Sequence, residues 1–136
     1  MAKTTYEPLQ ENEFLKELIG QTCLDIQVRA NNERLIFYLE DGRRLCMEHD
    51  KECCEAVWLE EIIGDLADLI GTPILVAEER IHESTDDDAP PGLSKKDHDY
   101  TWSFYEFRTI EGSVTLRWYG TSNGCYSERV DLCWLR

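Results

Sequence analysis

The stretch HDKECCEAVWLEEIIGDLADLIG, residues 49–71, separates a run of short strand patterns on its N-terminal side from another on its C-terminal side. Its first part holds a histidine and two adjacent cysteines. Its second part predicts a short strand or turn over residues 57–62, then a helix capped near Gly64 or Asp65 that stops at Gly71. A single kinked helix is the alternative. This stretch therefore decides the centre of the fold and is the first place to look for a site.

Patterns of alternating apolar and polar residues lie on both sides of this stretch. They predict strands over residues 23–30, 34–40, 43–49, 73–83, 99–110, 113–120 and 125–135. Residues 11–20 carry apolar side chains at helical spacing and predict a short N-terminal helix. Residues 84–98 are acidic, contain Pro and Gly, and predict a mobile loop. We expect one α+β domain over residues 1–136, dominated by antiparallel sheet, with the N-terminal helix and a central helix packed on it.

The composition is strongly acidic: the chain has 28 Asp and Glu and 14 Lys and Arg, giving a formal net charge of −14. Such a surface repels nucleic-acid phosphates and anionic lipid, so we expect no direct binding to nucleic acid or membrane. Solubility alone explains acidity in most proteins, but an acidic surface can also attract a protein that itself holds DNA or RNA. The chain has no long apolar span and no secretory pattern, so we expect a soluble protein in the cytoplasm, that of a bacterial host cell. We also expect a monomer.

The start of the central stretch offers an imidazole and two thiols within one tight segment, and zinc prefers these ligands. The predicted zinc ligands are His49, Asp50, Cys53 and Cys54, with Cys125 or Glu55 as substitutes. Their spacing matches no common zinc finger. Free cysteines also commonly act as small buried apolar residues, so both interpretations stay open. The zinc would be structural.

Catalytic interpretations of the same residues have less support. A cysteine nucleophile with His49 as its base would need an oxyanion hole and an orienting group, and the sequence identifies neither. No phosphate-binding or dinucleotide fingerprint is present. We expect a non-enzymatic protein, with a thiol- or metal-dependent hydrolase as an alternative.

Aromatic residues gather in the predicted strand over residues 99–110. Alternation places Trp102 and Phe104 on one face of this strand and Tyr105 and Phe107 on the other. They could resemble a base-stacking platform, but such platforms accompany basic grooves. The acidic charge therefore favours packing in the core and on the sheet surface.

Three segments carry a resemblance to a known family: H-D-x-x-C-C-E at residues 49–55, I-x-G-D-L-x-D-L-I-G at residues 62–71, and W-Y-G-x-S-N-G-x-Y-S-E at residues 118–128. With them, the chain resembles a family of small phage and mobile-element proteins of unknown function over most of residues 33–131. The resemblance singles out the motif positions His49, Asp50, Cys53, Cys54, Glu55, Gly64, Asp65, Gly71, Trp118, Tyr119, Gly120, Asn123 and Gly124. It implies a family but no activity.

By its size, its charge and its Cys and His segment, the chain is also similar to type II anti-CRISPR proteins, which inhibit the RNA-guided nuclease Cas9. This analogy implies an inhibitor that binds Cas9 through acidic surface and blocks loading of target DNA. The predicted partner-binding residues are Glu60, Glu61, Asp65 and Asp68. The alternative is a zinc-stabilised phage accessory protein with another host partner.

Overall fold

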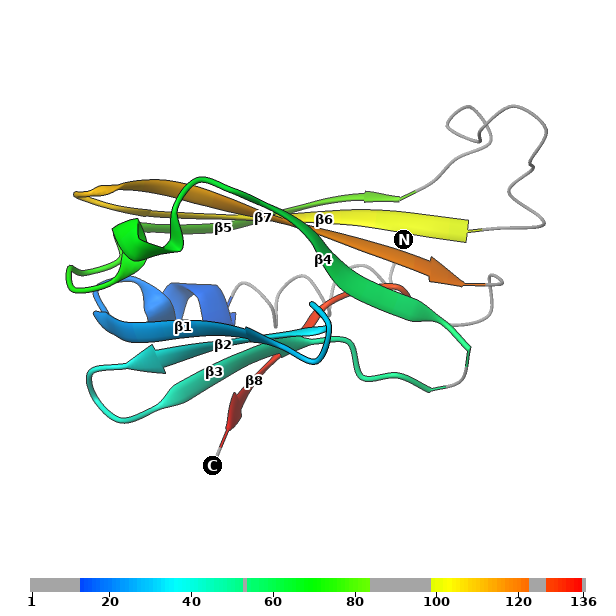
Figure 1. The fold of residues 1–136 in the computed structure, drawn as a ribbon, viewed down its shortest axis with the longest axis horizontal. Helices are drawn as coiled ribbons and strands as arrows, with labels where there is room; N and C mark the ends of the chain where they lie inside the picture. The colour runs from blue at the N-terminus through cyan, green and yellow to red at the C-terminus, as the bar shows by residue number, and fades with distance from the viewer. Residues whose placement is uncertain (1–12, 53, 84–98, 123–126, 136) are drawn as a thin grey trace.

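The computed structural model describes residues 13–52, 54–83, 99–122 and 127–135, and in these the strands form two four-stranded antiparallel sheets. The first sheet has the order β1-β2-β3-β8 and contains β1 (Cys23–Arg29), β2 (Arg34–Leu39), β3 (Arg44–Glu48) and β8 (Asp131–Leu135). The second sheet has the order β4-β7-β6-β5 and contains β4 (Ala56–Ile63), β5 (Val76–Glu83), β6 (Asp99–Thr109) and β7 (Gly112–Ser122). Figure 1 shows the sheets as two layers lying face to face.

The predicted strands are confirmed, with two shortened at their start. β5 begins at Val76 and β8 at Asp131, both later than the patterns indicate. The predicted mobile loop over residues 84–98 lies outside the described residues. The single domain over residues 1–136 stays a prediction.

The core lies between the two sheets and follows the alternation along each strand. In β7, Val114, Leu116 and Trp118 are fully buried, whereas the intervening residues are more exposed. Phe37 of the first sheet contacts Phe107 of the second, with ring centroids 5.1 Å apart. Alternating strands therefore bury one face of each sheet against the other.

The N-terminal helix is confirmed for its described part, residues 13–18. Leu15 and Leu18 are buried in the core. The helix stops where Gly20 adopts a positive φ of 89° and donates its N–H to the Ile74 carbonyl at 2.7 Å. In the part of the chain that is described, no helix is long and apolar enough to cross a membrane.

The predicted central helix is wrong. The short strand or turn predicted over residues 57–62 is strand β4 (Ala56–Ile63). Where the helix was predicted to follow, the chain forms one 3-10 turn, η1 (Leu66–Leu69), capped by the Asp65 side chain, which accepts from the Ala67 N–H at 3.0 Å. This single turn is enough to bury Leu69 in the core, so the helical spacing of the apolar residues does not require a longer helix. Gly71 then donates its N–H to the Cys23 carbonyl at 2.9 Å, which ties the chain to β1. The structure is thus β-dominated, with a short helix and η1.

Candidate functional site

A buried pair of side chains lies just after β3. The side chain of His49 is 6 % exposed and that of Glu55 is 0 % exposed, and their atoms Nε2 and Oε2 are 2.7 Å apart. The other ring nitrogen, Nδ1, lies 2.6 Å from the carbonyl oxygen of Arg129, in the segment that leads into β8. The N–H of Glu52 also donates to Glu55 Oε2 at 2.7 Å. The pair therefore joins the 49–55 turn to the start of β8.

The hydrogen bonds of His49 place one proton on its ring, at Nδ1. A carbonyl oxygen only accepts, so Nδ1 must carry a proton. The contact between Nε2 and Glu55 then holds one further proton, on the imidazole or on the carboxyl group. Both ring nitrogens are thus engaged within the protein, and a metal or a thiol could use His49 only by replacing one of these contacts.

The structure brings together only part of the predicted zinc set. Asp50 and Cys54 are exposed, and Cys53 and Cys125 lie outside the described residues. Glu55, a predicted substitute ligand, is the residue that contacts His49. Within the described ranges, no group of three or more His, Cys, Asp or Glu side chains could hold a metal ion. The zinc site stays a prediction, because it includes a residue outside those ranges.

A second buried carboxylate, Glu128, lies in the segment between β7 and β8 and is 8 % exposed. Its Oε1 accepts from the Thr101 hydroxyl at 2.7 Å, and its Oε2 accepts from the Ser122 hydroxyl. Gly120 makes room for this segment, since a Cβ there would lie 2.4 Å from the Glu128 carbonyl oxygen. These contacts fix residues 127–130 against the second sheet.

Two of the segments that carry the family resemblance therefore contribute to one polar region between the sheets. Residues 49–55 supply the His49–Glu55 pair, and residues 118–128 supply Gly120 and Glu128. The burial of Glu128 was not predicted from the sequence. An acid six residues after Ser122 offers no signal of burial, because residue type alone does not separate a buried carboxylate from a solvated one.

The acids predicted to bind a partner follow β4 into η1. Glu60, Glu61 and Asp65 are exposed, and Asp68 is half-buried. The Asp65 side chain caps η1, and the Asp68 carboxylate lies close to Gly112. Glu60 and Glu61 are therefore the two of these acids that neither cap η1 nor lie against Gly112.

A β-bulge explains why two consecutive acids are exposed on a strand. Leu59 pairs with Trp118, and Glu61 pairs with Arg117, which leaves Glu60 as the extra residue. A bulge places one more residue on a strand than its neighbour has and bends it locally. Glu60 accepts from the Trp58 indole N–H at 2.8 Å, and Glu61 pairs with the Arg117 guanidinium at 2.8 Å.

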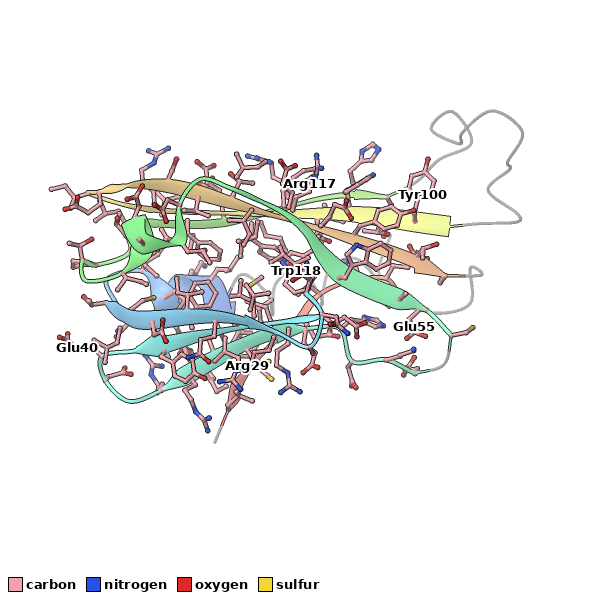
Figure 2. The ribbon with its side chains drawn as sticks, in the orientation of Figure 1. Arg29, Glu40, Glu55, Tyr100, Arg117 and Trp118 are labelled. Atoms are coloured by element: carbon pink, nitrogen blue, oxygen red, sulfur yellow. The ribbon has the colours of Figure 1, made fainter. Side chains whose placement is uncertain are left out.

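The outer face of the second sheet carries half-buried aromatic rings beside these acids. We call Trp58, Tyr100, Trp102 and Tyr119 the aromatic face. Tyr119 lies at its centre, with ring centroids 5.1 Å from Trp58, 4.7 Å from Trp102 and 6.2 Å from Tyr100. Burial raises the pKa of Tyr119, so its phenol stays neutral at physiological pH. Figure 2 shows Tyr100 and Arg117 on the outer side of the sheet and Trp118 pointing to the interior.

The family model for a domain of unknown function, DUF7448, matches residues 16–132. The chain belongs to this family. Comparisons with curated proteins and with solved structures find no match. The matched range includes the His49–Glu55 pair, Glu128 and the aromatic face of this chain.

Proposed function

We propose that this protein is a non-enzymatic binding protein that occupies the basic, nucleic-acid-binding surface of another protein. The observation that carries the proposal is the bulge in β4, which exposes the Glu60 and Glu61 carboxylates beside the aromatic face. Trp, Tyr and Arg side chains dominate the energetic centres of protein interfaces. Surrounding acids favour a basic partner and speed its encounter.

The net charge of −14 supports a protein partner over a nucleic acid. Phosphates would be repelled at long range, whereas a basic channel would be attracted. A protein held in such a channel would compete with nucleic acid for the same side chains. Inhibition would then require only binding and no chemistry.

The specific partner that we propose is Cas9. Its guide–target duplex and displaced strand lie in positively charged channels, which an acidic protein could occupy before target DNA enters. The similarity in size and charge to type II anti-CRISPR proteins supports this choice. Binding there would obstruct loading of target DNA.

An order-of-addition assay tests the proposal. Purified Cas9 with its guide RNA receives the protein either before or after target DNA, and cleavage is measured over a range of protein concentrations. We expect inhibition only when the protein is added first, saturating near equimolar amounts and weakening at high salt. Cleavage unaffected in several Cas9 orthologues would remove Cas9 as the partner, and inhibition far below equimolar amounts would indicate an enzyme.

Matched charge variants locate the interface. Glu60→Gln with Glu61→Gln keeps an acceptor oxygen for Trp58 and for Arg117 while removing two charges. The control, Glu13→Gln with Glu40→Gln, removes the same charge from exposed positions on the helix and on the β2–β3 turn. We expect the first variant to lose more inhibition than the control. Equal losses would place the interface elsewhere.

A further inference from the structure

The aromatic face occupies one part of the outer surface of the second sheet. Along β6, Tyr100, Trp102 and Phe104 come first, and Glu106 and Arg108 follow toward the other end of the strand. At that other end, Glu106 forms ion pairs with Arg108 at 3.4 Å and with Arg80 at 3.9 Å. The sheet surface is thus divided into an aromatic part and an ion-paired part.

Within the aromatic part, the protein already holds one guanidinium of its own. The Arg117 guanidinium carbon lies 5.1 Å from the centroid of the Trp102 ring, and its Nη2 lies 2.8 Å from a Glu61 carboxylate oxygen. A ring face attracts a cation through its quadrupole, and a carboxylate binds the same guanidinium by a charge-assisted hydrogen bond. This arrangement shows that a ring and a carboxylate of this surface together hold a guanidinium.

A second ring and a second carboxylate lie next to this arrangement on the edge strand β4. The Trp58 indole N–H donates to Glu60 at 2.8 Å, which fixes the carboxylate beside the ring. Trp58 also packs edge-on against Tyr119, with an interplanar angle of 62°. β4 is the last strand of the sheet in the described residues, and the Leu59 N–H on its edge is bonded to the Asn32 carbonyl of the β1–β2 turn at 2.6 Å. A partner can approach this ring and carboxylate from the outer face, where Trp58 is half-buried and Glu60 is exposed.

We propose that Trp58, Tyr119 and Glu60 bind an arginine side chain of the basic partner, with its guanidinium against the rings and paired with the carboxylate. The inference rests on the proposed function, since it assumes a basic protein partner. Arginine suits this surface better than lysine. A guanidinium is planar and weakly hydrated, and it stacks on rings while donating in its own plane, whereas an ammonium is a compact and strongly hydrated charge.

The Glu60 carboxylate beside these rings favours a cation over the base of a nucleic acid. Glu60 and Glu61 lie on the β4 side, and Arg117 is paired with Glu61. His82 of β5 is opposite Trp102 in the strand register. Base-stacking surfaces add a basic groove that follows the phosphates. The net charge of −14 opposes such a groove.

The indole N–H signals of the protein's four tryptophans provide the test. Two lie on the aromatic face, Trp118 is fully buried, and Trp134 lies in the first sheet, where the Arg43 guanidinium carbon is 4.3 Å from its ring centroid. The full-length ¹⁵N-labelled protein is titrated with an oligoarginine peptide and with an oligolysine peptide of equal length. Both peptides carry the same charge, so the difference between them isolates the contribution of the guanidinium.

We expect oligoarginine to shift the indole signal of Trp58 saturably, with those of Trp118 and Trp134 unchanged. We also expect oligoarginine to bind about fivefold more tightly than oligolysine, which corresponds to a difference of about 1 kcal/mol between a stacked guanidinium and an ammonium at these rings. Trp58→Leu should reduce that ratio to about one, with the unchanged Trp118 and Trp134 signals reporting an intact fold. Glu60→Gln should weaken oligoarginine binding more than the equal charge change Glu40→Gln.

Equal affinity for the two peptides, or shifts spread over all four indoles, would overturn the inference. The peptide titration contains no Cas9, so its outcome is independent of the cleavage assay. Arginine preference without Cas9 inhibition would leave this site standing and remove the proposed partner. Cas9 inhibition without arginine preference would support the proposed partner and remove this site.

Discussion

Replacing Gly120 by alanine is expected to displace the segment that carries Glu128. A Cβ at this position would lie 2.4 Å from the Glu128 carbonyl oxygen, 2.8 Å from Glu128 Cβ and 3.0 Å from Val57 Cγ2. The nearest of these atoms belongs to backbone, so no side-chain rotation removes the clash. Residues 127–130 must therefore move away from β7.

The size of the effect comes from two contributions. Overpacking a well-packed site costs about 1–3 kcal/mol. Moving Glu128 also weakens its hydrogen bonds with Thr101 and Ser122, each contributing about 1 kcal/mol. We expect Gly120→Ala to lower the free energy of unfolding by about 2–4 kcal/mol. That is a large fraction of the stability of an ordinary domain.

Urea denaturation measures this loss, and hydrogen exchange locates it. Gly42→Ala is the control, because Gly42 has a φ of 95° but a Cβ there meets nothing within 4 Å. Its cost, about 1–2 kcal/mol, comes from backbone conformation alone. Amides of residues 127–135 should lose protection first in Gly120→Ala. A loss no larger than that of Gly42→Ala, or protection lost evenly over both sheets, would refute the reasoning.

Three further predictions concern thiols, pH and metal. Burial raises the pKa of Cys46 to about 12, so N-ethylmaleimide should modify exposed Cys54 well before Cys46 at mildly alkaline pH; equal rates by mass spectrometry would contradict this. Burial also raises the pKa of Glu79, so its contribution to stability is present at acid pH and is lost as pH rises through the folded-state value. Glu79→Gln should therefore raise the Tm at neutral pH but not at acid pH, and an equal gain at both would count against burial as the cause. Metal analysis of tag-free protein tests the zinc prediction: a stoichiometric ion that His49→Ala and Cys53→Ser both lose would support it, and folded metal-free protein would remove it.

The strands could be predicted because their signal is local. In β7, apolar residues at every second position correspond to the buried face, and the turn at residues 111–112 marks where β6 ends. The same local reasoning failed at residues 66–70. The spacing of Leu66, Leu69 and Ile70 fits a helix, but one 3-10 turn satisfies it equally well when the next residues bond to β1. Periodicity over so few residues does not distinguish these outcomes.

For the candidate sites too, the sequence indicated some of the residues but not the contacts that they make. The sequence singled out His49 and Glu60 by residue type and by their place in the central stretch. It could not indicate that His49 pairs with Glu55 and reaches the Arg129 carbonyl, 80 positions away. Nor could it show that a bulge turns Glu60 and Glu61 outward together, because a bulge depends on how the neighbouring strand is paired.

By itself, the sequence determined that this protein is acidic, that it is built mainly from short alternating strands, and that His49, the paired cysteines and the acids lie close together in the chain. Charge and alternation depend only on which residues are present and in what order. The tertiary structure alone decided which carboxylates are buried, where the aromatic rings gather, and which acids face solvent. Those outcomes depend on contacts between strands that are distant in the chain, and such contacts form only when the two sheets pack together.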